Sequence, residues 1–368
     1  MASGEAGDGL DPAFDREPQP RPRWRRRSPG RRFGNFGGDR GGATYAALDL
    51  GTNNCRLLVA RPTYDGFRVV DAFSRIIRLG EGVTASRRLS EPAMERALEA
   101  LVICRNKMRN KGVTRARLIA TEACRAAENG QEFCVRVAAE LGIELEVIDR
   151  GTEAELAATG CVPLIDPQAE GVVLFDIGGG SSELVWLGRS QPARHGPALP
   201  QIRGWISLSH GVVTLAERHG GVTVTYEIYE RMIAEVAEAI APFAREHGGT
   251  RGIHLLGTSG TVTTIAGVHL ELKRYDRNRV DGCWMNVQEV NAVIQRLLGM
   301  SYQERVDSPC IGAERADLVL AGCAILEAIR RAFPSQRLRV ADRGLREGML
   351  VQMMRADDVW GAGQVAAQ

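Results

Sequence analysis

Hydrophobic residues in the first half of the chain occur either in short runs or at the spacing of a helix. The short runs predict β-strands at residues 67–73, 76–79, 116–121 and 143–148. The helical spacing predicts helices at residues 91–112, 130–142 and 152–160. Gly112 and Gly142 are expected to end the first two helices, because glycine readily adopts the left-handed conformation of a helix end. Thr152 is the expected N-cap of the third helix, with Glu155 as its capping-box partner.

The second half of the chain continues the alternation. A long helix is expected at residues 226–249, and residues 253–267 predict a strand that runs through a Gly/Ser/Thr turn into a helix. Further helices are expected at residues 287–300, at 315–333 and from about Gly344 onward. Strands and helices that alternate in this way predict an α/β fold, with helices packed on two mixed sheets.

Two hairpins in the chain follow the same pattern. Residues 45–60 read YAALDLGTNNCRLLVA and residues 172–187 read VVLFDIGGGSSELVWL. Each consists of an apolar strand, an aspartate, a glycine-containing turn and a second apolar strand. At an offset of 127 positions the two segments share an aspartate, a glycine and a leucine: Asp49 and Asp176, Gly51 and Gly178, Leu57 and Leu184. The repeat predicts two related lobes.

Residues 1–42 differ in composition from the rest of the chain. They are rich in Arg, Gly and Pro, so they cannot bury enough apolar surface to form a core and are expected to be disordered. Nine arginines and six acidic residues give this segment a net charge of +3 and leave about −1 for the remaining chain. With Trp24, Phe33 and Phe36 among the arginines, the segment is suited to nonspecific contact with RNA or another polyanion. The alternative is a solvated, dispensable extension.

The composition excludes several classes of protein. No apolar run reaches the roughly 18 residues of a membrane span, and the N-terminus lacks the pattern of a signal peptide. These features predict a cytoplasmic protein without a membrane partner. The eight cysteines are scattered without a C-x-x-C pair, and the six histidines have no metal-ligand spacing. The pattern supports neither a disulfide framework nor a zinc site.

Three glycine-rich turns are candidate phosphate sites. A tight glycine turn between strands directs backbone N–H groups into one concavity, where they bind an anion. Such turns are expected at residues 51–54 and 178–182, and a third, GTSGT at residues 257–261, opens a helix whose N-terminus favours an anion. The candidate phosphate-binding residues are Gly51, Thr52, Asn53, Asn54, Arg56, Gly178, Gly179, Gly180, Ser181, Gly257, Ser259 and Gly260.

Acidic residues flank the first two turns. Asp49 and Asp176 each end a buried strand, and Glu183 lies across the hairpin from Asp176. Since Mg²⁺ prefers one or two carboxylates together with phosphate oxygens, these three residues are the candidate metal ligands. The alternative is that each aspartate only caps its own turn.

Seven motifs in this order resemble one known family. They read DLGTNNCRLLVA, RIIRLGEGV, IATEACRAAEN, DRGTEAELAATG, DIGGGSSELV, LGTSGT and DRGLREGML. In these motifs the chain resembles the exopolyphosphatase/guanosine pentaphosphate phosphohydrolase (Ppx/GppA) family over residues 45–352. The resemblance implies two ribonuclease-H-like lobes of the actin, sugar-kinase and Hsp70 superfamily with the active site between them. It also implies Mg²⁺ dependence and hydrolysis of a terminal phosphoanhydride.

The resemblance assigns roles to particular residues. The family's catalytic glutamate falls on Glu153, its metal- and water-binding acids on Asp176 and Glu183, and the arginine of its A-T-x-A-x-R segment on Arg125. The chain departs from the family in having a single glutamate at the catalytic segment, where two adjacent ones are usual, and Thr-Asn-Asn in the first loop, where Ser-Asn-Ser is common. Because of the first departure, the catalytic glutamate could be displaced from Glu153, and Glu155 is then the alternative residue.

Glu153 and two arginines also suit these roles on physical grounds. In the first turn of a helix, Glu153 lies near the positive end of the helix dipole, which is expected to keep it ionised. It could then accept a proton from a water behind the terminal phosphorus; the alternative is that it only improves helix capping. Arg125 and Arg56 can neutralise charge on the phosphoryl oxygens, although Arg56 could equally be a surface partner of an acid.

The leading hypothesis is a Mg²⁺-dependent exopolyphosphatase that releases terminal orthophosphate from inorganic polyphosphate. A guanosine pentaphosphate 5′-phosphohydrolase uses the same chemistry and stays open, because the chain lacks the C-terminal helical region of longer family members and offers less surface to a long polymer. A catalytically weak binder of guanosine tetraphosphate or polyphosphate would keep the loops and lose the base. A kinase of the superfamily is less supported, since no segment supplies an acceptor-sugar site.

Four segments are expected along the chain. They are a disordered tail at 1–42, a first ribonuclease-H-like lobe at 43–150, a second lobe at 151–355 whose last helix packs on the first, and a flexible C-terminus at 356–368. Dimers among family members suggest a homodimer by analogy alone.

Overall fold

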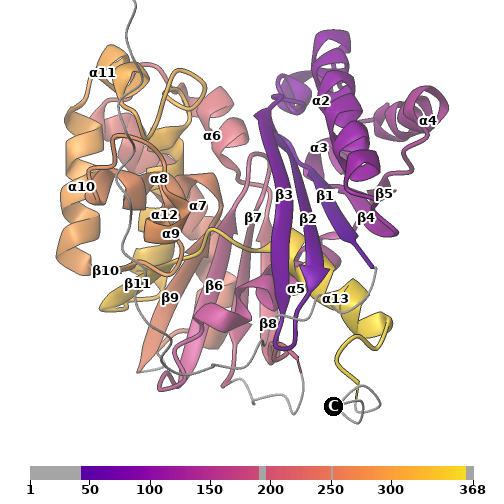
Figure 1. The fold of residues 1–368 in the computed structure, drawn as a ribbon. Coiled ribbons are helices and arrows are strands. Elements are labelled where there is room, and N and C mark those ends of the chain that lie inside the picture. Colours follow the sequence, from indigo (N-terminus) through magenta and orange to yellow (C-terminus); the bar gives the residue numbers. More distant parts are fainter. Residues whose placement is uncertain (1–42, 190–195, 250–251, 362–368) are drawn as a thin grey trace, which may run out of the picture. The chain divides into compact units, whose positions relative to one another are not determined.

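The computed structural model describes residues 43–189, 196–249 and 252–361. In this part of the chain, two β-sheets are each covered by helices, as Figure 1 shows with the first sheet in indigo and the second in rose to orange. The first lobe is here the first sheet with helices α1 to α4, and the second lobe is the second sheet with helices α6 to α12. The predicted disordered tail lies outside the described residues.

The first sheet begins with the predicted hairpin. Its strands are β1 (Tyr45–Leu50), β2 (Asn54–Pro62), β3 (Phe67–Ile76), β4 (Arg115–Ala120) and β5 (Glu146–Val147), in the order β3-β2-β1-β4-β5. β1, β2 and β3 pair antiparallel, whereas β4 and β5 continue the sheet parallel to β1. The sheet is therefore mixed, with the carboxyl ends of β1 and β4 side by side.

The second sheet repeats this order. Its strands are β6 (Gly171–Ile177), β7 (Ser182–Leu187), β8 (Ile202–Leu208), β9 (Ile253–Thr258), β10 (Trp284–Asn286) and β11 (Arg337–Val340). The order β8-β7-β6-β9-β11 matches β3-β2-β1-β4-β5 strand for strand, and β10 is added at the edge. β7 and β8 pair antiparallel while β9 and β11 run parallel to β6. The predicted α/β fold with two related mixed sheets is confirmed.

Helices cover both faces of the two sheets. The first lobe contains α1 (Val83–Ser86), α2 (Glu91–Asn110), α3 (Glu122–Ala126) and α4 (Gly130–Leu141). The second contains α6 (Val212–His219), α7 (Tyr226–His247), α8 (Ser259–His269), α9 (Arg277–Val280), α10 (Val287–Gly299), α11 (Tyr302–Asp307) and α12 (Val319–Ala332). Two further helices, α5 (Arg150–Cys161) and α13 (Leu345–Ala356), contact each other, and a short 3₁₀ turn (Val162–Leu164) follows α5.

Three local predictions need correction. The strand expected at 67–73 extends to Ile76 as β3, because residues 74–76 still pair with β2, and residues 77–79 of the strand expected at 76–79 lie outside any strand. The strand expected at 143–148 is only two residues long. The N-cap of α5 is Asp149, whose carboxylate accepts from the backbone N–H of Thr152 at 2.9 Å, so the helix begins two residues before the predicted start.

α5 packs against both sheets. Its Leu156 joins a buried cluster with Tyr45 and Leu58 of the first sheet and with Met349 of α13. On another face of the same helix, Ala158 joins a cluster with strand residues of the second sheet. A lobe boundary at residue 150 therefore stays a prediction, because α5 contributes to both hydrophobic cores.

Glycines allow α5 and α13 to approach backbone to backbone. A methyl group on Gly160 would lie 1.9 Å from the carbonyl oxygen of Gly344, and one on Gly348 would lie 2.0 Å from that of Leu156. Gly160→Ala or Gly348→Ala is therefore expected to lower the free energy of unfolding by about 1–3 kcal/mol, since the helices must move apart. Urea unfolding followed by circular dichroism measures the change. Gly299→Ala, where nothing lies within 4 Å, is the control; an equal loss there would contradict the packing argument.

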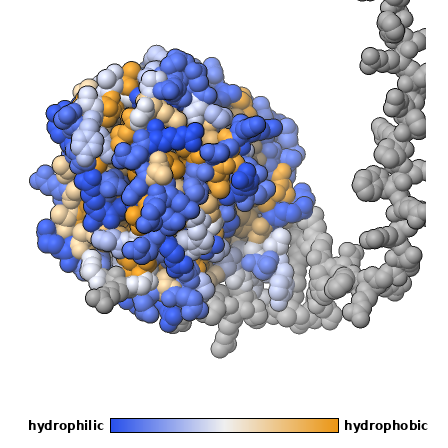
Figure 2. Space-filling view, turned by 90° about the vertical axis from the view of Figure 1, so that its left-hand side faces the viewer, coloured by the Kyte–Doolittle hydropathy of each residue, from blue (hydrophilic) through white to orange (hydrophobic). Residues whose placement is uncertain are grey.

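The outer surface of the second lobe is polar. Figure 2 shows that hydrophilic residues dominate the face over α10 and α11, with hydrophobic residues in small separate areas. Among the described residues, no helix is both long and apolar enough to cross a bilayer.

Candidate active site

A small cavity lies where the two sheets bring their hairpin turns together. It has a volume of about 100 Å³ and is lined by the turns at 51–54 and 178–181, by the first turns of α3 and α5, and by residues 342–347. This space is called the inner cavity below.

The two glycine turns of the inner cavity have the same backbone geometry. The N–H of Gly51 donates to the carbonyl of Asn54 at 2.9 Å, and the N–H of Gly178 donates to that of Ser181 at 3.0 Å. In each lobe the segment after the third strand (β3 or β8) holds the turn through a backbone hydrogen bond. The N–H of Gly80 donates to the carbonyl of Thr52, and the N–H of Val213 donates to the carbonyl of Gly179. Within the described chain, the N–H groups of Thr52, Asn53, Gly179 and Gly180 donate no backbone hydrogen bond and are available to an anion.

Glycines in the second turn are required because the two turns touch. A methyl group on Gly179 would lie 2.9 Å from the Cβ of Thr52, and one on Gly180 would lie 2.9 Å from its Oγ1. The side-chain oxygens of Asn53 and Asn54 are buried without a hydrogen-bond partner in the described residues. The turns therefore form one clamp with unsatisfied polar groups on its inner side.

Carboxylates lie in the middle of the inner cavity. Asp176 and Glu183 are directly opposite each other in the β6–β7 ladder, and Asp49 lies opposite Arg56 in the matching ladder of the first sheet. Burial raises the pKa of Asp176 to about 6 and that of Glu183 to about 7. Burial also raises the pKa of Asp49, which the guanidinium of Arg56 opposes. Like charges at directly opposed positions repel, so this group is suited to binding a cation.

The donor set fits Mg²⁺. Asp49, Asp176 and Glu183 offer only carboxylate oxygens, and Ser207 Oγ orients one of them by donating to Glu183 Oε1 at 2.8 Å. Among the described residues, no group of three or more His, Cys, Asp or Glu is placed so that it could hold a metal ion as a cage of protein ligands. Mg²⁺ uses one or two carboxylates and completes its shell with water and phosphate oxygens, so such a cage is not needed.

Glu153 lies at one end of the inner cavity. Arg125 Nη2 donates to Glu153 Oε2 at 3.1 Å and to Glu122 Oε2 at 2.5 Å, and Arg125 Nη1 donates to the carbonyl of Ile148 at 2.7 Å. Arg150 Nη2 donates to the other oxygen of Glu122 at 2.9 Å. The backbone and the two arginines thus fix the glutamate carboxylates of this end.

The expectation that Glu153 stays ionised because of the helix dipole needs correction. Burial raises the pKa of Glu153 well above its usual value, and the carboxylates of Glu183, Asp49 and Asp176 raise it further. Arg125 alone opposes this shift among its main electrostatic neighbours. The dipole contribution is smaller than the burial cost, because the side chain points into a cavity crowded with acids.

Arginines also line the inner cavity, and the side that they occupy is called the basic end below. Arg56 and Arg346 line it, and neither has an ion-pair partner within the described part of the chain. Arg315 lies near Arg56 without lining the cavity: burial and the guanidinium of Arg56 lower the pKa of both Arg315 and Arg346. Cations that repel one another at the edge of a small cavity are suited to binding an anion.

Most of the sequence-predicted site residues line the inner cavity. Those that do are Asp49, Gly51, Thr52, Asn53, Asn54, Arg56, Glu153, Asp176, Gly178, Gly179, Gly180, Ser181, Glu183 and Ser259. Arg125 reaches it through Glu153. Gly257 and Gly260 do not line it; Gly257 lies in β9, where a methyl group would lie 2.5 Å from the ring of Phe175. The fallback base Glu155 is exposed and accepts from Gln352, outside the cavity.

Sequence reasoning missed four charged residues of this site. Glu122 and Arg150 hold the Glu153 end, and Arg315 and Arg346 form the basic end. Glu122 stands three residues before Arg125 in a quoted motif, and Arg346 stands in another, so proximity to a known motif could have indicated both. Arg315 carries no local signal.

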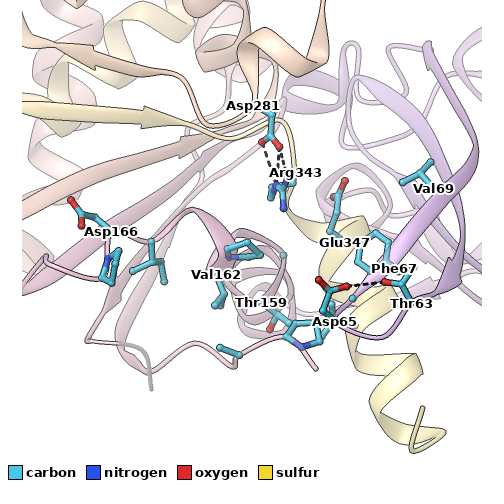
Figure 3. Close-up of a pocket in the computed structure, with 18 of the residues that line it drawn as sticks. Thr63, Asp65, Phe67, Val69, Thr159, Val162, Asp166, Asp281, Arg343 and Glu347 are labelled. Carbon is cyan, nitrogen blue, oxygen red and sulfur yellow. Dashed lines mark hydrogen bonds and ion pairs between the residues drawn. The ribbon is translucent and has the colours of Figure 1, made fainter. Parts of the chain in front are cut away.

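A larger cavity of about 920 Å³ lies at the far end of the β2–β3 hairpin. Figure 3 shows Asp65 and Phe67 from the hairpin tip on one side and the Asp281–Arg343 ion pair on the other. Its main charged groups are already paired with one another: Asp281 with Arg343, Arg277 with Glu347 and Asp166 with Arg337. The smaller inner cavity, with its unpaired charges and open N–H groups, is the better candidate for chemistry.

Two related sheets that hold glycine turns around buried carboxylates define the class of two-lobed α/β proteins with a site between the lobes. Within that class, the chain belongs to the Ppx/GppA phosphatase family, whose model matches residues 58–357.

Solved structures share the whole fold. The Ppx/GppA family member of Aquifex aeolicus is 27% identical, with a TM-score of 0.71 over 86% of this chain and 99% of that one. A structure described as an exopolyphosphatase-like protein is 30% identical, with a TM-score of 0.76 over 85% of this chain and 98% of that one. An exopolyphosphatase from Cytophaga hutchinsonii, 24% identical with a TM-score of 0.77 over 85% and 98% of the chains, shares the fold.

Proposed function

We propose that this protein is a Mg²⁺-dependent exopolyphosphatase, which releases terminal orthophosphate from inorganic polyphosphate by attack of water. The observation that carries the proposal is the set of charged groups that line the inner cavity. Glu153, which is suited to act as base, and the carboxylates of Asp49, Asp176 and Glu183 line it together with Arg56 and Arg346, which have no ion-pair partner among the described residues. The 30% identical exopolyphosphatase-like protein supports the same activity.

The terminal phosphoryl group is placed between the two glycine turns. Their N–H groups, which donate no backbone hydrogen bond, bind its oxygens. Glu153 lies on one side of that position and accepts the proton of the attacking water. Arg125 holds the carboxylate of Glu153 in place at 3.1 Å and keeps it directed into the cavity.

The remaining phosphate chain lies toward the basic end. Attack and departure occur in line, so the leaving oxygen faces away from Glu153 and toward Arg56, Arg315 and Arg346. Their positive charge stabilises the negative charge that builds up on the leaving chain. Positioning and charge stabilisation of this kind make up most of a protein's contribution to the catalysis of phosphoryl transfer.

Asp49, Asp176 and Glu183 are the residues that would hold Mg²⁺. When bound, the ion neutralises charge on the phosphoryl oxygens. The carboxylates themselves keep the ion beside the glycine turns, and Ser207 fixes the orientation of Glu183.

A guanosine pentaphosphate 5′-phosphohydrolase is the second candidate. Tyr275 is 44% exposed and lies close to Asp342 and to Arg315. An exposed aromatic ring beside an arginine can stack on a purine base. The same inner cavity would then cleave the terminal phosphate of a nucleotide.

Phosphate release from defined substrates tests the proposal. We expect release from polyphosphates of defined length with Mg²⁺, loss of release in EDTA, and its return when Mg²⁺ is added back. Guanosine pentaphosphate is assayed in parallel, and the ratio of the two kcat/KM values assigns the preferred substrate. A protein that releases nothing from either substrate but binds the nucleotide tightly would be a binding protein and not an enzyme.

A further inference from the structure

A second cavity, called the basic pocket below, adjoins the inner cavity. It has a volume of about 740 Å³ and lies between α1 and α3 of the first lobe, the start of α5, and α6 of the second lobe. Its charged lining consists of four arginines, Arg87, Arg125, Arg150 and Arg218, against two acids, Glu122 and Asp149. The surplus of positive charge suits an anion.

A thin wall separates the two cavities. Thr52, Gly180 and Glu122 line both of them. The Thr52 side chain fills the space between two glycines: a methyl group on Gly80 would lie 2.2 Å from its Cγ2, and one on Gly180 would lie 2.9 Å from its Oγ1. The wall between the two cavities is therefore only about one residue thick at Thr52, Gly180 and Glu122.

The basic pocket lies on the side of the inner cavity from which water attacks. Arg125 lines the pocket and holds Glu153, whereas Arg56 and Arg346 line the inner cavity but not the pocket. In-line displacement leaves orthophosphate on the Glu153 side and the shortened chain on the opposite side. The orthophosphate must therefore leave by a route that the shortened chain does not occupy.

We propose that the basic pocket binds the orthophosphate product and is its exit from the inner cavity. The proposal rests on the proposed function, because it needs phosphate to be released between the glycine turns. The ligand class is inorganic phosphate, a small anion that four guanidinium groups can bind through charge-assisted hydrogen bonds.

The ion pairs of these arginines suit an exit rather than a tight binding site. Arg87 lies 3.5 Å from Glu128, Arg218 pairs with Glu235, and Arg150 pairs with Glu122 at 2.9 Å. A carboxylate near each guanidinium competes with phosphate and weakens its binding. An ion that passes through a site must bind well enough to enter and weakly enough to leave.

The double variant Arg87→Gln/Arg218→Gln tests the exit. Neither residue lines the inner cavity, so the variant leaves the base and the metal ligands intact. Equilibrium dialysis with radiolabelled orthophosphate is expected to show two classes of bound phosphate in the wild type and about tenfold weaker binding at one of them in the variant. The KM for short polyphosphate is expected to stay unchanged.

The matched control is Arg136→Gln/Arg331→Gln, which removes the same charge from paired surface arginines outside both cavities. Orthophosphate binding that is the same in the test variant as in the wild type overturns the exit. A KM that rises with substrate length in the test variant also overturns it, because the pocket then holds substrate and not product. A wild-type protein that releases no phosphate from any substrate contradicts the proposed function alone, because dialysis still measures whether orthophosphate binds in the basic pocket.

Discussion

Glu153→Gln is expected to lower phosphate release about 100- to 10,000-fold, the range that a positioned general base contributes. Glutamine preserves the shape of the side chain and can still accept the hydrogen bond from Arg125, which is 3.1 Å long in the wild type. It cannot take a proton from water. Single-turnover phosphate release from short polyphosphate and from guanosine pentaphosphate measures the loss, and substrate affinity is expected to remain within a few-fold of the wild type.

The neighbouring Glu155 provides a matched control. It lies two residues after Glu153 in the same helix and is exposed. Its Oε1 accepts a hydrogen bond from Gln352 Nε2 at 3.2 Å, outside the inner cavity. Glu155→Gln is expected to retain wild-type activity. Full activity of Glu153→Gln on every substrate, or loss of activity in Glu155→Gln alone, would show that the base has been assigned to the wrong residue.

Asp176→Asn is expected to lower activity at least about 100-fold and to abolish the stabilisation of the fold by Mg²⁺, since even residues that only support a metal ligand contribute 10- to 100-fold. In the wild type, Mg²⁺ that binds only the folded protein is expected to raise Tm by mass action. Thermal unfolding with and without Mg²⁺ measures this effect independently of activity. The control Asp166→Asn changes an aspartate paired with Arg337, away from the inner cavity, and is expected to keep the Mg²⁺ effect.

The pH dependence of stability follows from the same carboxylates. The pKa of Asp176 rises from 3.8 in a free chain to about 6, and that of Glu183 rises from 4.5 to about 7. The metal-free fold binds more protons than the unfolded chain in this window, so it loses stability as pH rises from about 4 to 7. Mg²⁺ competes with these protons, so its effect on Tm is expected to be larger at pH 8 than at pH 5.5. An equal Tm shift at both values would contradict binding at these carboxylates.

Local pattern was sufficient to predict the two hairpins and their turns. An apolar strand followed by an aspartate, a glycine turn and a second strand fixes the antiparallel register, because the short turn leaves little freedom in pairing. The sequence therefore placed Asp176 opposite Glu183, and the ladder confirms this position. The repeat at an offset of 127 also predicted two related sheets, which the identical strand orders confirm.

Local pattern was insufficient where a short segment depends on distant ones. β5 is two residues long because only Glu146 and Val147 reach β4, and the start of α5 is set by the carboxylate of Asp149 rather than by Thr152. The length of β5 and the start of α5 leave the hydrophobic pattern of these segments unchanged. Each depends on which backbone groups of neighbouring segments are close enough for a hydrogen bond.

The ionisation of Glu153 was wrongly predicted for a related reason. The helix position alone indicated a low pKa, but the side chain is buried among acids that come from β1, β6 and β7. Three strands from two sheets must meet before that environment exists. A pKa is set by burial and by charges within a few ångströms, and neither is a property of the local sequence.

By itself, the sequence determined the α/β class, the paired hairpins, the glycine turns and the family, because these features depend on spacing within short segments. The tertiary structure alone decided that Arg56, Arg315 and Arg346 converge opposite Glu153, and that a basic pocket lies behind Thr52. The three arginines come from β2, from the turn before α12 and from α13, which are far apart in the chain. Their arrangement follows from how two related lobes pack around α5 and α13, which no single segment encodes.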